Sequence, residues 1–372
     1  MKLGWSNILH DRVRFATTVL GIAFSVFLML FQGSLLFGFL RAASKLIDTT
    51  EADLWVTARG VVCFDFSARL PKRYIEIAKG VPGVSSVARI AESFAEYRTP
   101  SGRHQIVALV GADPGVGNHF PVPRLPGSIA ALAPDGVVVD ASNADLLNAS
   151  GQSVDIEIND RRARVLGVIS GFSSFLGCPY VFTSYDDAKR YLNLGSEDAM
   201  YILLHVREGV SVDAVKRQLQ ARLPDVDVWT KSEFSRRSRL YWITQTGAGG
   251  GILMAAILGF FIGVAIVSQN MYATTMENLE EFATLRAIGA SAWFIVKVVL
   301  TQALVCGVVG CTLGLIATAP LVNLARTTIA WITTPWWLPA FMIPPSLGMC
   351  VLAAIISVRA ATSVEPAKVF RA

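Results

Sequence analysis

Charged residues are scarce in this chain of 372 residues. Asp, Glu, Lys and Arg make up 16% of it, whereas an ordinary soluble domain carries about 25%. Hydrophobic residues make up 53%, and the mean hydropathy is +0.49. A composition this poor in charge predicts that part of the chain lies in a membrane.

Histidine and cysteine are also few, which limits metal and disulfide chemistry. The four histidines show no metal-ligand spacing: His10, His104, His119 and His205. Cys306, Cys311 and Cys350 lie in apolar stretches and are predicted to pack as small apolar side chains. Cys63 and Cys178 lie in the polar middle of the chain. Whether these two form a disulfide is left open, because spacing does not test the geometry of the bond.

The sequence lacks the motifs of a nucleotide-hydrolysing enzyme and of other common enzyme classes. It contains no G-x-x-x-x-G-K-[ST] phosphate loop and no nucleophile, base and oxyanion set with supporting spacing. The net charge is +5, but no basic run with interleaved aromatics points to nucleic acid. We therefore expect no catalytic, cofactor-binding or metal-binding residue on this chain.

Four long apolar runs are present instead. A bilayer core about 30 Å thick needs about 20 helical residues to cross it. The runs predict membrane-spanning helices at residues 15–40, 247–271, 293–319 and 346–358. The last is the weakest, because Pro344 and Pro345 shorten its clean helix. Phe341 is an alternative start for it. No Asp or Glu lies inside any run, which argues against a proton-coupled or ion-coupled pump.

Residues 42–240 differ from the rest of the chain, because charges return there. Short alternating or β-branched runs predict strands at residues 53–56, 106–110, 136–140, 154–158, 164–169, 180–182 and 201–206. Helices are predicted at residues 73–79, 142–148, 185–192 and 212–222. The fold class is therefore an α-helical membrane protein with four transmembrane helices and a mixed α/β extracytoplasmic domain inserted between helices 1 and 2. Residues 1–41 hold the first helix, and residues 241–372 hold the other three.

Four spans place both termini on one side of the membrane, and we expect that side to be the cytoplasm. Arg326 is the single charge in the short outer loop, which fits this orientation. Arg236, Arg237 and Arg239 lie just before the second span on the expected outer side and oppose it. Long domains are largely exempt from the charge rule, so the rule does not decide the orientation.

Small residues recur in the second and third spans at the four-residue spacing that lets helix backbones approach closely. The pairs are Gly247 and Gly251, Gly259 and Gly263, and Gly310 and Gly314. They predict a helix–helix interface, and the pattern leaves open whether it lies within one subunit or between two copies.

The inner loop at about residues 276–290 predicts a short amphipathic helix. Leu279, Phe282 and Leu285 recur at intervals of three, and Ile288 follows three residues later. Gly289 is a natural helix stop. Such a helix lies across the membrane surface or in the groove of a partner.

The same loop carries a family resemblance. The segment from Glu281 to Ser291, EFATLRAIGAS, resembles the loop motif of the MacB/FtsX family of ABC-transporter permeases. The tail at residues 364–371 resembles the family's ending, through Pro366, Val369, Phe370 and Arg371. The opening residues 5–25 and the segment 52–56 are similar to the DevC branch. Leu279 and Glu280 stand where many relatives carry basic residues, which bears on the details of partner contact.

The resemblance implies a transport subunit without its own ATPase activity. A separate ABC ATP-binding subunit would bind ATP and Mg and would dock on an ATPase-coupling helix made by Glu281, Phe282, Leu285, Arg286, Ile288 and Gly289. Two copies would pair as a homodimer in the bacterial inner membrane. Motion would pass through a helix near residues 231–242 to the periplasmic domain, unless the arginines there only contact lipid headgroups.

The resemblance also implies partners outside the membrane and leaves the role open. Export or efflux would use a periplasmic adaptor (membrane fusion) protein and an outer-membrane channel. The alternatives are an FtsX-like signalling subunit that activates an extracytoplasmic enzyme, a lipoprotein-release subunit, or a four-span receptor without an ATPase.

Overall fold

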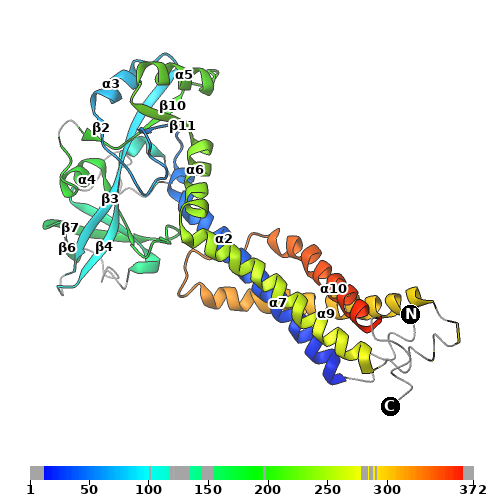
Figure 1. Ribbon diagram of the computed structural model, residues 1–372. Coiled ribbons are helices and arrows are strands. Elements are labelled where there is room, and N and C mark those ends of the chain that lie inside the picture. The colour runs from blue at the N-terminus through cyan, green and yellow to red at the C-terminus, as the bar shows by residue number, and fades with distance from the viewer. Residues whose placement is uncertain are drawn as a thin grey trace. The chain divides into compact units, whose positions relative to one another are not determined.

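The computed structural model describes residues 12–99, 102–117, 120, 134–144, 154–195, 198–277, 284, 288–289 and 291–362. The chain divides into two compact units (Figure 1). The first takes the chain up to Gly38 and from Gly249 onward, and the second is Phe39–Ala248. The predicted extracytoplasmic domain falls within the second unit.

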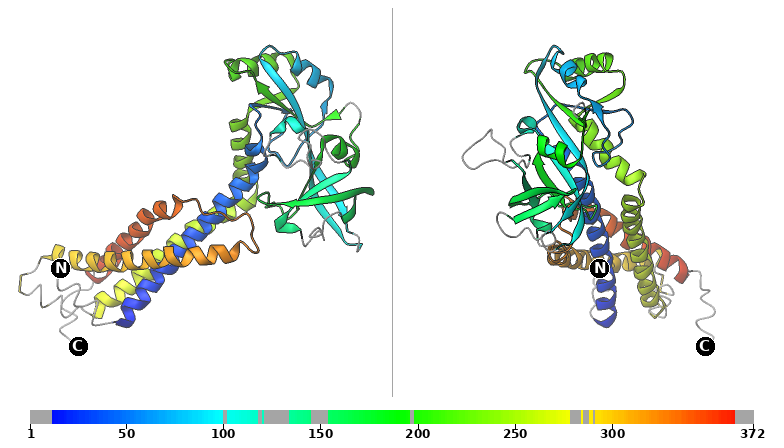
Figure 2. Two further views of the ribbon diagram at one scale, coloured as in Figure 1. Left: turned by 180° about the vertical axis from the view of Figure 1, so that it is seen from behind. Right: turned by 90° about the vertical axis from the view of Figure 1, so that its left-hand side faces the viewer.

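The first unit is built from four long helices. They are α2 (Arg12–Thr49), α7 (Gly247–Glu277), α9 (Ala292–Ala325) and α10 (Leu338–Thr362), and they run side by side (Figures 1 and 2). Within the described part of the chain, each holds a segment long and apolar enough to cross a membrane, with a mean hydropathy of 2.1 to 2.5. The prediction of four apolar spanning helices is confirmed.

Helix α2 is longer than its apolar run. The run was predicted to end at residue 40, but the helix continues to Thr49. Leu46 and Ile47 are 3% and 0% exposed in the core of the second unit, so burial on one face stabilises the extra turns. A side-chain hydrogen bond between residues four positions apart adds to the stability of these turns, since Ser44 Oγ donates to Asp48 Oδ2 at 2.7 Å.

Helix α10 starts earlier than predicted and runs through Pro344 and Pro345. The expectation that these prolines would shorten it is wrong. Proline removes a backbone donor, but serine side chains and neighbouring helices compensate in a membrane bundle. The prolines leave the carbonyls of Ala340 and Phe341 without their usual helical donor, whereas the nearby Ser346 hydroxyl donates to the Met342 carbonyl at 2.6 Å.

The second unit is a mixed sheet of nine strands, counted over the described residues, in the order β11-β1-β10-β3-β4-β8-β5-β7-β6. The strands are β1 (Leu54–Ala58), β3 (Val84–Arg98), β4 (His104–Ala112), β5 (Gly136–Asp140), β6 (Val154–Ile158), β7 (Arg161–Ile169), β8 (Tyr180–Ser184), β10 (Tyr201–Val206) and β11 (Val226–Thr230). The pairs β4–β8 and β5–β7 are parallel, and the others are antiparallel. The short strands β2 (Leu70–Pro71) and β9 (Asp198–Ala199) pair separately.

Helices pack on this sheet. They are α3 (Arg73–Lys79), α4 (Tyr185–Tyr191), α5 (Val212–Arg222) and α6 (Lys231–Thr244), and short 3-10 turns lie at η1 (Pro114–Val116) and η2 (Ala141–Asn143). Of the helix predicted at residues 142–148, the described residues 142–144 form only the end of η2 and a turn, and the remainder lies outside the described residues.

The alternation of β1 divides the core of this unit between the two faces of the sheet. Leu54 and Val56 are fully buried in a cluster with residues of α3 and α5. Trp55 points to the other face, where its ring lies 5.3 Å from that of Phe234 in α6 and 5.6 Å from that of Tyr201. Helix α6 is therefore part of the folded domain rather than a free connection to the second span.

Candidate functional site

Of the coupling helix predicted at about residues 276–290, the structure describes residues 276 and 277, which end α7, and residues 284, 288 and 289. Its residues Glu281, Phe282, Leu285 and Arg286 lie outside the described residues. The Ile288 N–H donates to the Thr284 carbonyl at 3.1 Å, as in a helix, and Ile288 is 79% exposed. Gly289 has φ +105°, in the region that glycine enters without steric cost. The described end fits a helix that stops at Gly289, and its docking role stays a prediction.

The end of the loop motif has a structural role that the sequence analysis did not assign. Ser291 Oγ accepts the Phe294 N–H at 3.3 Å and caps the start of α9. A serine in this position stabilises a helix by about 1 kcal/mol. The tail residues Pro366, Val369, Phe370 and Arg371 lie outside the described residues, and their role also stays a prediction.

Four of the six predicted interface glycines face helices of the same chain: Gly259, Gly263, Gly310 and Gly314. A Cβ at Gly310 would lie 2.7 Å from Ile22 Cβ of α2, and a Cβ at Gly314 would lie 2.6 Å from the Ala23 carbonyl oxygen. Contacts this short leave room only for glycine. These positions therefore serve close packing inside one chain.

The other two glycines lie on an uncovered face of α7. No atom lies within 4 Å of the Cβ position at Gly247 or Gly251. In the most apolar part of α7, 17% of the residues are buried, against 39% to 44% in the other three spans. Gln269, on the same helix, is exposed. Helix α7 is therefore the span with the most surface available to lipid or to another chain.

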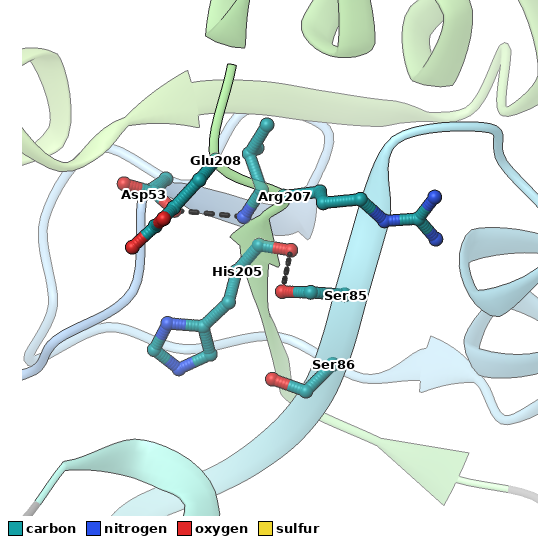
Figure 3. A pocket seen from close by; sticks show the side chains of 7 residues that line it. Asp53, Ser85, Ser86, His205, Arg207 and Glu208 are labelled. Carbon is teal, nitrogen blue, oxygen red and sulfur yellow. Dashed lines mark hydrogen bonds between the residues drawn. The ribbon is translucent and has the colours of Figure 1, made fainter. Parts of the chain in front are cut away.

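An open recess of about 580 Å³ lies on the second unit, where β1, β3 and β10 meet. Two of its polar side chains have partners (Figure 3): Asp53 Oδ2 accepts the Val206 N–H at 2.7 Å, and Ser85 Oγ donates to the His205 carbonyl at 3.0 Å. The close-up shows Asp53 and Glu208 on one side and the Arg207 guanidinium on the other. The arrangement offers no nucleophile beside a base, and we assign it no chemistry.

Helix α6 has a strongly specified start. Thr230 and Glu233 form a capping box, in which Thr230 Oγ1 accepts the Glu233 N–H at 3.3 Å and Glu233 Oε2 accepts the Thr230 N–H at 2.7 Å. Each partner satisfies a backbone donor that the helix itself cannot pair. Lys216 also donates to Glu233 at 2.5 Å, and these partners lower the pKa of Glu233 although burial opposes them.

The end of α2 and helix α6 contact each other inside the second unit. Arg239 pairs with Asp48 at 3.5 Å, and Lys231 Nζ donates to the Thr50 carbonyl at 2.7 Å. Arg237 stacks over the Trp229 ring at 4.7 Å, whereas Arg236 is exposed. Two of the three arginines before the second span thus have partners within the domain, and only Arg236 keeps the lipid-facing alternative.

The last turn of α6 is fixed by an aromatic and polar cluster. The Trp242 ring lies 4.8 Å from that of Phe175 and 6.3 Å from that of Phe39. Its Nε1–H donates to Asp65 Oδ2 at 3.0 Å, and Tyr180 Oη donates to Asp65 Oδ1 at 3.2 Å. Asp65 is 4% exposed. Burial raises its pKa from 3.8 to about 6, although both hydrogen bonds act in the opposite direction.

A second buried carboxyl lies near Asp65. Glu92, in the middle of β3, is 1% exposed, and its Oε2 has no hydrogen-bond partner. Burial, with a further contribution from the charge of Asp65, raises the pKa of Glu92 well above its usual value. Glu92 therefore stays protonated to a higher pH than an exposed glutamate does. The sequence analysis missed both carboxyls, because a single Asp or Glu in a polar stretch reads as solvent-exposed.

The two extracytoplasmic cysteines are free thiols in the structure. Cys63 is fully buried, and burial raises its pKa to about 12. Cys178 is half-buried. The disulfide that the sequence left open is not formed here.

These features define a class of protein before any comparison is made. Four apolar helices, with a mixed α/β domain between the first and the second, make a multi-pass membrane protein. Family models then match both parts: the MacB-like periplasmic core domain over residues 15–222 and the FtsX-like permease C-terminal region over residues 253–366. The chain belongs to the MacB/FtsX family of ABC-transporter permeases.

Relatives along the whole chain are also permeases. An uncharacterized ABC transporter permease of Mycobacterium tuberculosis is 23% identical over 364 residues, which cover 96% of this chain and 95% of the relative. An uncharacterized permease of Mycobacterium bovis matches equally. A second permease of M. tuberculosis is 21% identical over 338 residues, which cover 90% and 88% of the two chains.

Solved structures give more distant similarities. The periplasmic region of MacB from Actinobacillus actinomycetemcomitans covers 51% of this chain and 94% of its own, with 14% identity and a TM-score of 0.40. The extracellular domain of the noncanonic ABC-type transporter YknZ from Gram-positive bacteria covers 48% and 98%, with 13% identity and a TM-score of 0.36.

Proposed function

We propose that this chain is the mechanotransmission subunit of an ATP-driven ABC exporter. The main support for this proposal is that one family match covers the α/β domain and another covers the last three spans. A separate ATP-binding subunit binds ATP and Mg, and this chain converts its closure into motion of the extracytoplasmic domain. The chain lies in the inner membrane with both termini in the cytoplasm.

Helices α2 and α6 support a mechanical role. An α-helix is a stiff rod with a rise of 1.5 Å per residue. Helix α2 supplies residues to both units, and α6 is separated from α7 by only Gln245 and Thr246. Displacement of either span is therefore passed directly to elements of the domain core, where Ile47 and Phe234 are fully buried.

The coupling helix tests this proposal. Leu285→Asp together with Ile288→Asp places two charges on its apolar face, and we expect the variant to insert normally but to lose stimulation of the partner ATPase. ATPase activity is measured in reconstituted vesicles. Ile106→Asp, which charges a half-exposed apolar residue of the α/β domain, is the matched control and should keep stimulation. Full stimulation in the double variant would refute docking at this loop.

The uncovered face of α7 supports pairing of two copies. Glycine is a poor helix former, so the run of small residues at 247–251 costs stability if it only faces lipid. It is useful where a second helix approaches closely, and an amide such as Gln269 can hydrogen-bond across such a contact. We infer that the homodimer interface includes Gly247 and Gly251.

Export is favoured among the family's roles by the similarity to the DevC branch. It implies a periplasmic adaptor protein and an outer-membrane channel as partners. An FtsX-like signalling subunit and a lipoprotein-release subunit would use the same membrane architecture. Co-purification from the native membrane distinguishes them, since an adaptor would support export, whereas a hydrolase or a lipoprotein carrier in its place would refute it.

A further inference from the structure

The contact between Asp65 and Trp242 joins a buried acid to the helix that leads into the second span. Asp65 follows β1 in the chain, Tyr180 belongs to β8, and Trp242 belongs to the last turn of α6. The two donors Trp242 and Tyr180 reach different oxygens of the one carboxyl. Among the described residues, no three His, Cys, Asp or Glu side chains gather as metal ligands would.

We propose that Asp65 is a positioning residue that holds the last turn of α6 on the domain through its hydrogen bond with Trp242. Proton binding at the Asp65 carboxyl stabilises this Asp65–Trp242 contact, and proton loss weakens it. The ionised Asp65 carboxyl is buried almost without water and has only two hydrogen-bond donors. Burying a charge in this way is costly in free energy compared with burying the neutral acid. Release of Trp242 would let water reach Oδ2, so ionisation favours release.

The two hydrogen bonds by themselves favour the carboxylate, but the same two partners can also serve the protonated acid. The indole N–H of Trp242 is only a donor, whereas the hydroxyl of Tyr180 both donates and accepts. When Asp65 is protonated, the proton therefore lies on Oδ1. The Tyr180 hydroxyl, which donates to the carboxylate, then accepts this proton in a hydrogen bond. Oδ2 then remains a carbonyl oxygen and keeps the bond from Trp242. Every polar atom of the Asp65 carboxyl thus retains a partner after protonation.

The titratable groups near Asp65 are Cys63, Glu92, Tyr180 and Tyr201. Burial raises the pKa of the thiol and of both phenols, so these three are neutral near neutral pH. Burial also raises the pKa of Glu92 well above its usual value. Arg239, on the same helix as Trp242, pairs with Asp48. Asp65, whose pKa lies at about 6, is therefore expected to change charge between pH 5 and 8, and the Glu92→Gln variant separates its titration from that of Glu92.

The test follows Trp242 directly in the full-length protein, labelled with 5-fluorotryptophan and placed in lipid nanodiscs. Trp242→Phe identifies its fluorine signal. Between pH 5 and 8 we expect this signal to titrate with a midpoint of about 6. Amide hydrogen exchange in the last turn of α6, corrected for its intrinsic pH dependence, should rise several-fold over the same range.

Two isosteric variants decide which carboxyl is responsible. Asp65→Asn is always neutral, and its amide can accept from Trp242 and donate to Tyr180, so the signal should stay in the low-pH position at every pH. Glu92→Gln should keep the titration. A Trp242 signal that does not titrate in the wild type, that titrates unchanged in Asp65→Asn, or that stops titrating in Glu92→Gln overturns the proposal.

The consequence for transport, that an acidic exterior fastens α6 and lowers coupling, rests on the proposed function. The fluorine and exchange readouts need no ATP-binding subunit. The pH-dependent Asp65–Trp242 contact and the proposed transport function can therefore be refuted independently of each other.

Discussion

Single residues in this protein carry energetic costs that their sequence context does not reveal. Asp65 has a pKa of about 6 in the folded chain and 3.8 as a free side chain. A raised carboxyl pKa stabilises the fold below pH 4, and this contribution is lost as the pH rises through 6. A shift of this size corresponds to about 3 kcal/mol.

We therefore predict that thermal stability of the full-length protein in detergent falls between pH 4.5 and pH 8. Differential scanning calorimetry of the extracytoplasmic transition measures it. The Asp65→Asn variant should show a flatter profile and should be at least as stable as the wild type at pH 8. An equally steep decrease in the variant would assign the pH dependence to other groups, Glu92 first among them.

Gly310 gives a second prediction at this scale. A leucine there would push into Ile22 of α2, and overpacking of this kind costs typically 1–3 kcal/mol. Gly310→Leu should therefore lower the melting temperature of the purified chain. Gly348→Leu in α10 is the matched control, because open space surrounds that position, and it should leave the melting temperature unchanged. Equal loss in both variants would mean that packing space is not the cause.

At the scale of elements, the start of α6 is held by its capping box. Thr230→Ala removes the side-chain acceptor for the Glu233 N–H, and such a change costs about 1 kcal/mol. We predict faster hydrogen exchange in the first turn of α6 with little change in the sheet. Thr230→Ser keeps the acceptor and should restore protection. Uniform loss of protection across the domain would show that α6 does not open independently.

The sequence predicted most elements of this fold. The short strands β2 and β9 and the longer strands β3 and β11 were missed, and a physical cause can be given for β3. Apolar length identified the spans, and alternation identified seven strands, including the full bounds of β5, β6 and β10. Strand β3 was missed although it has 15 residues, because Arg89 and Glu92 break its pattern. Periodicity assumes that charges face water, but Glu92 is buried and Arg89 is bound by Asp113 at 2.8 Å.

Functional and packing residues could be predicted from the sequence only where neighbouring positions form a recognisable pattern. The glycine spacing indicated close helix contacts, and the structure shows four of the six positions in contact within the chain. Asp65 and Trp242 are separated by 177 positions, and spacing at that range carries no information without the fold. The partner-docking residues depend on a second protein, which neither the sequence nor a single chain contains.

At the scale of the whole molecule, the proposed function depends on the side of the membrane that holds the α/β domain. We predict that Glu208→Cys, introduced after Cys63 and Cys178 are replaced, reacts with an impermeant thiol reagent in intact spheroplasts. Glu208 is exposed at the open recess, so access is not limited by folding. Labelling that requires lysis would place the domain in the cytoplasm and reverse the orientation.

The unbroken course of α2 restricts how its length can vary. A helix turns about 100° with each residue. Ile22 and Val26 lie in one buried cluster of the first unit, so one added residue between them would rotate the face that holds Ile22 out of register with the face that holds Val26. Both residues are fully buried, and one of the two faces would then point into the wrong surroundings. Natural length changes in this segment should therefore come in whole double turns of about seven residues, which nearly restore the angular phase.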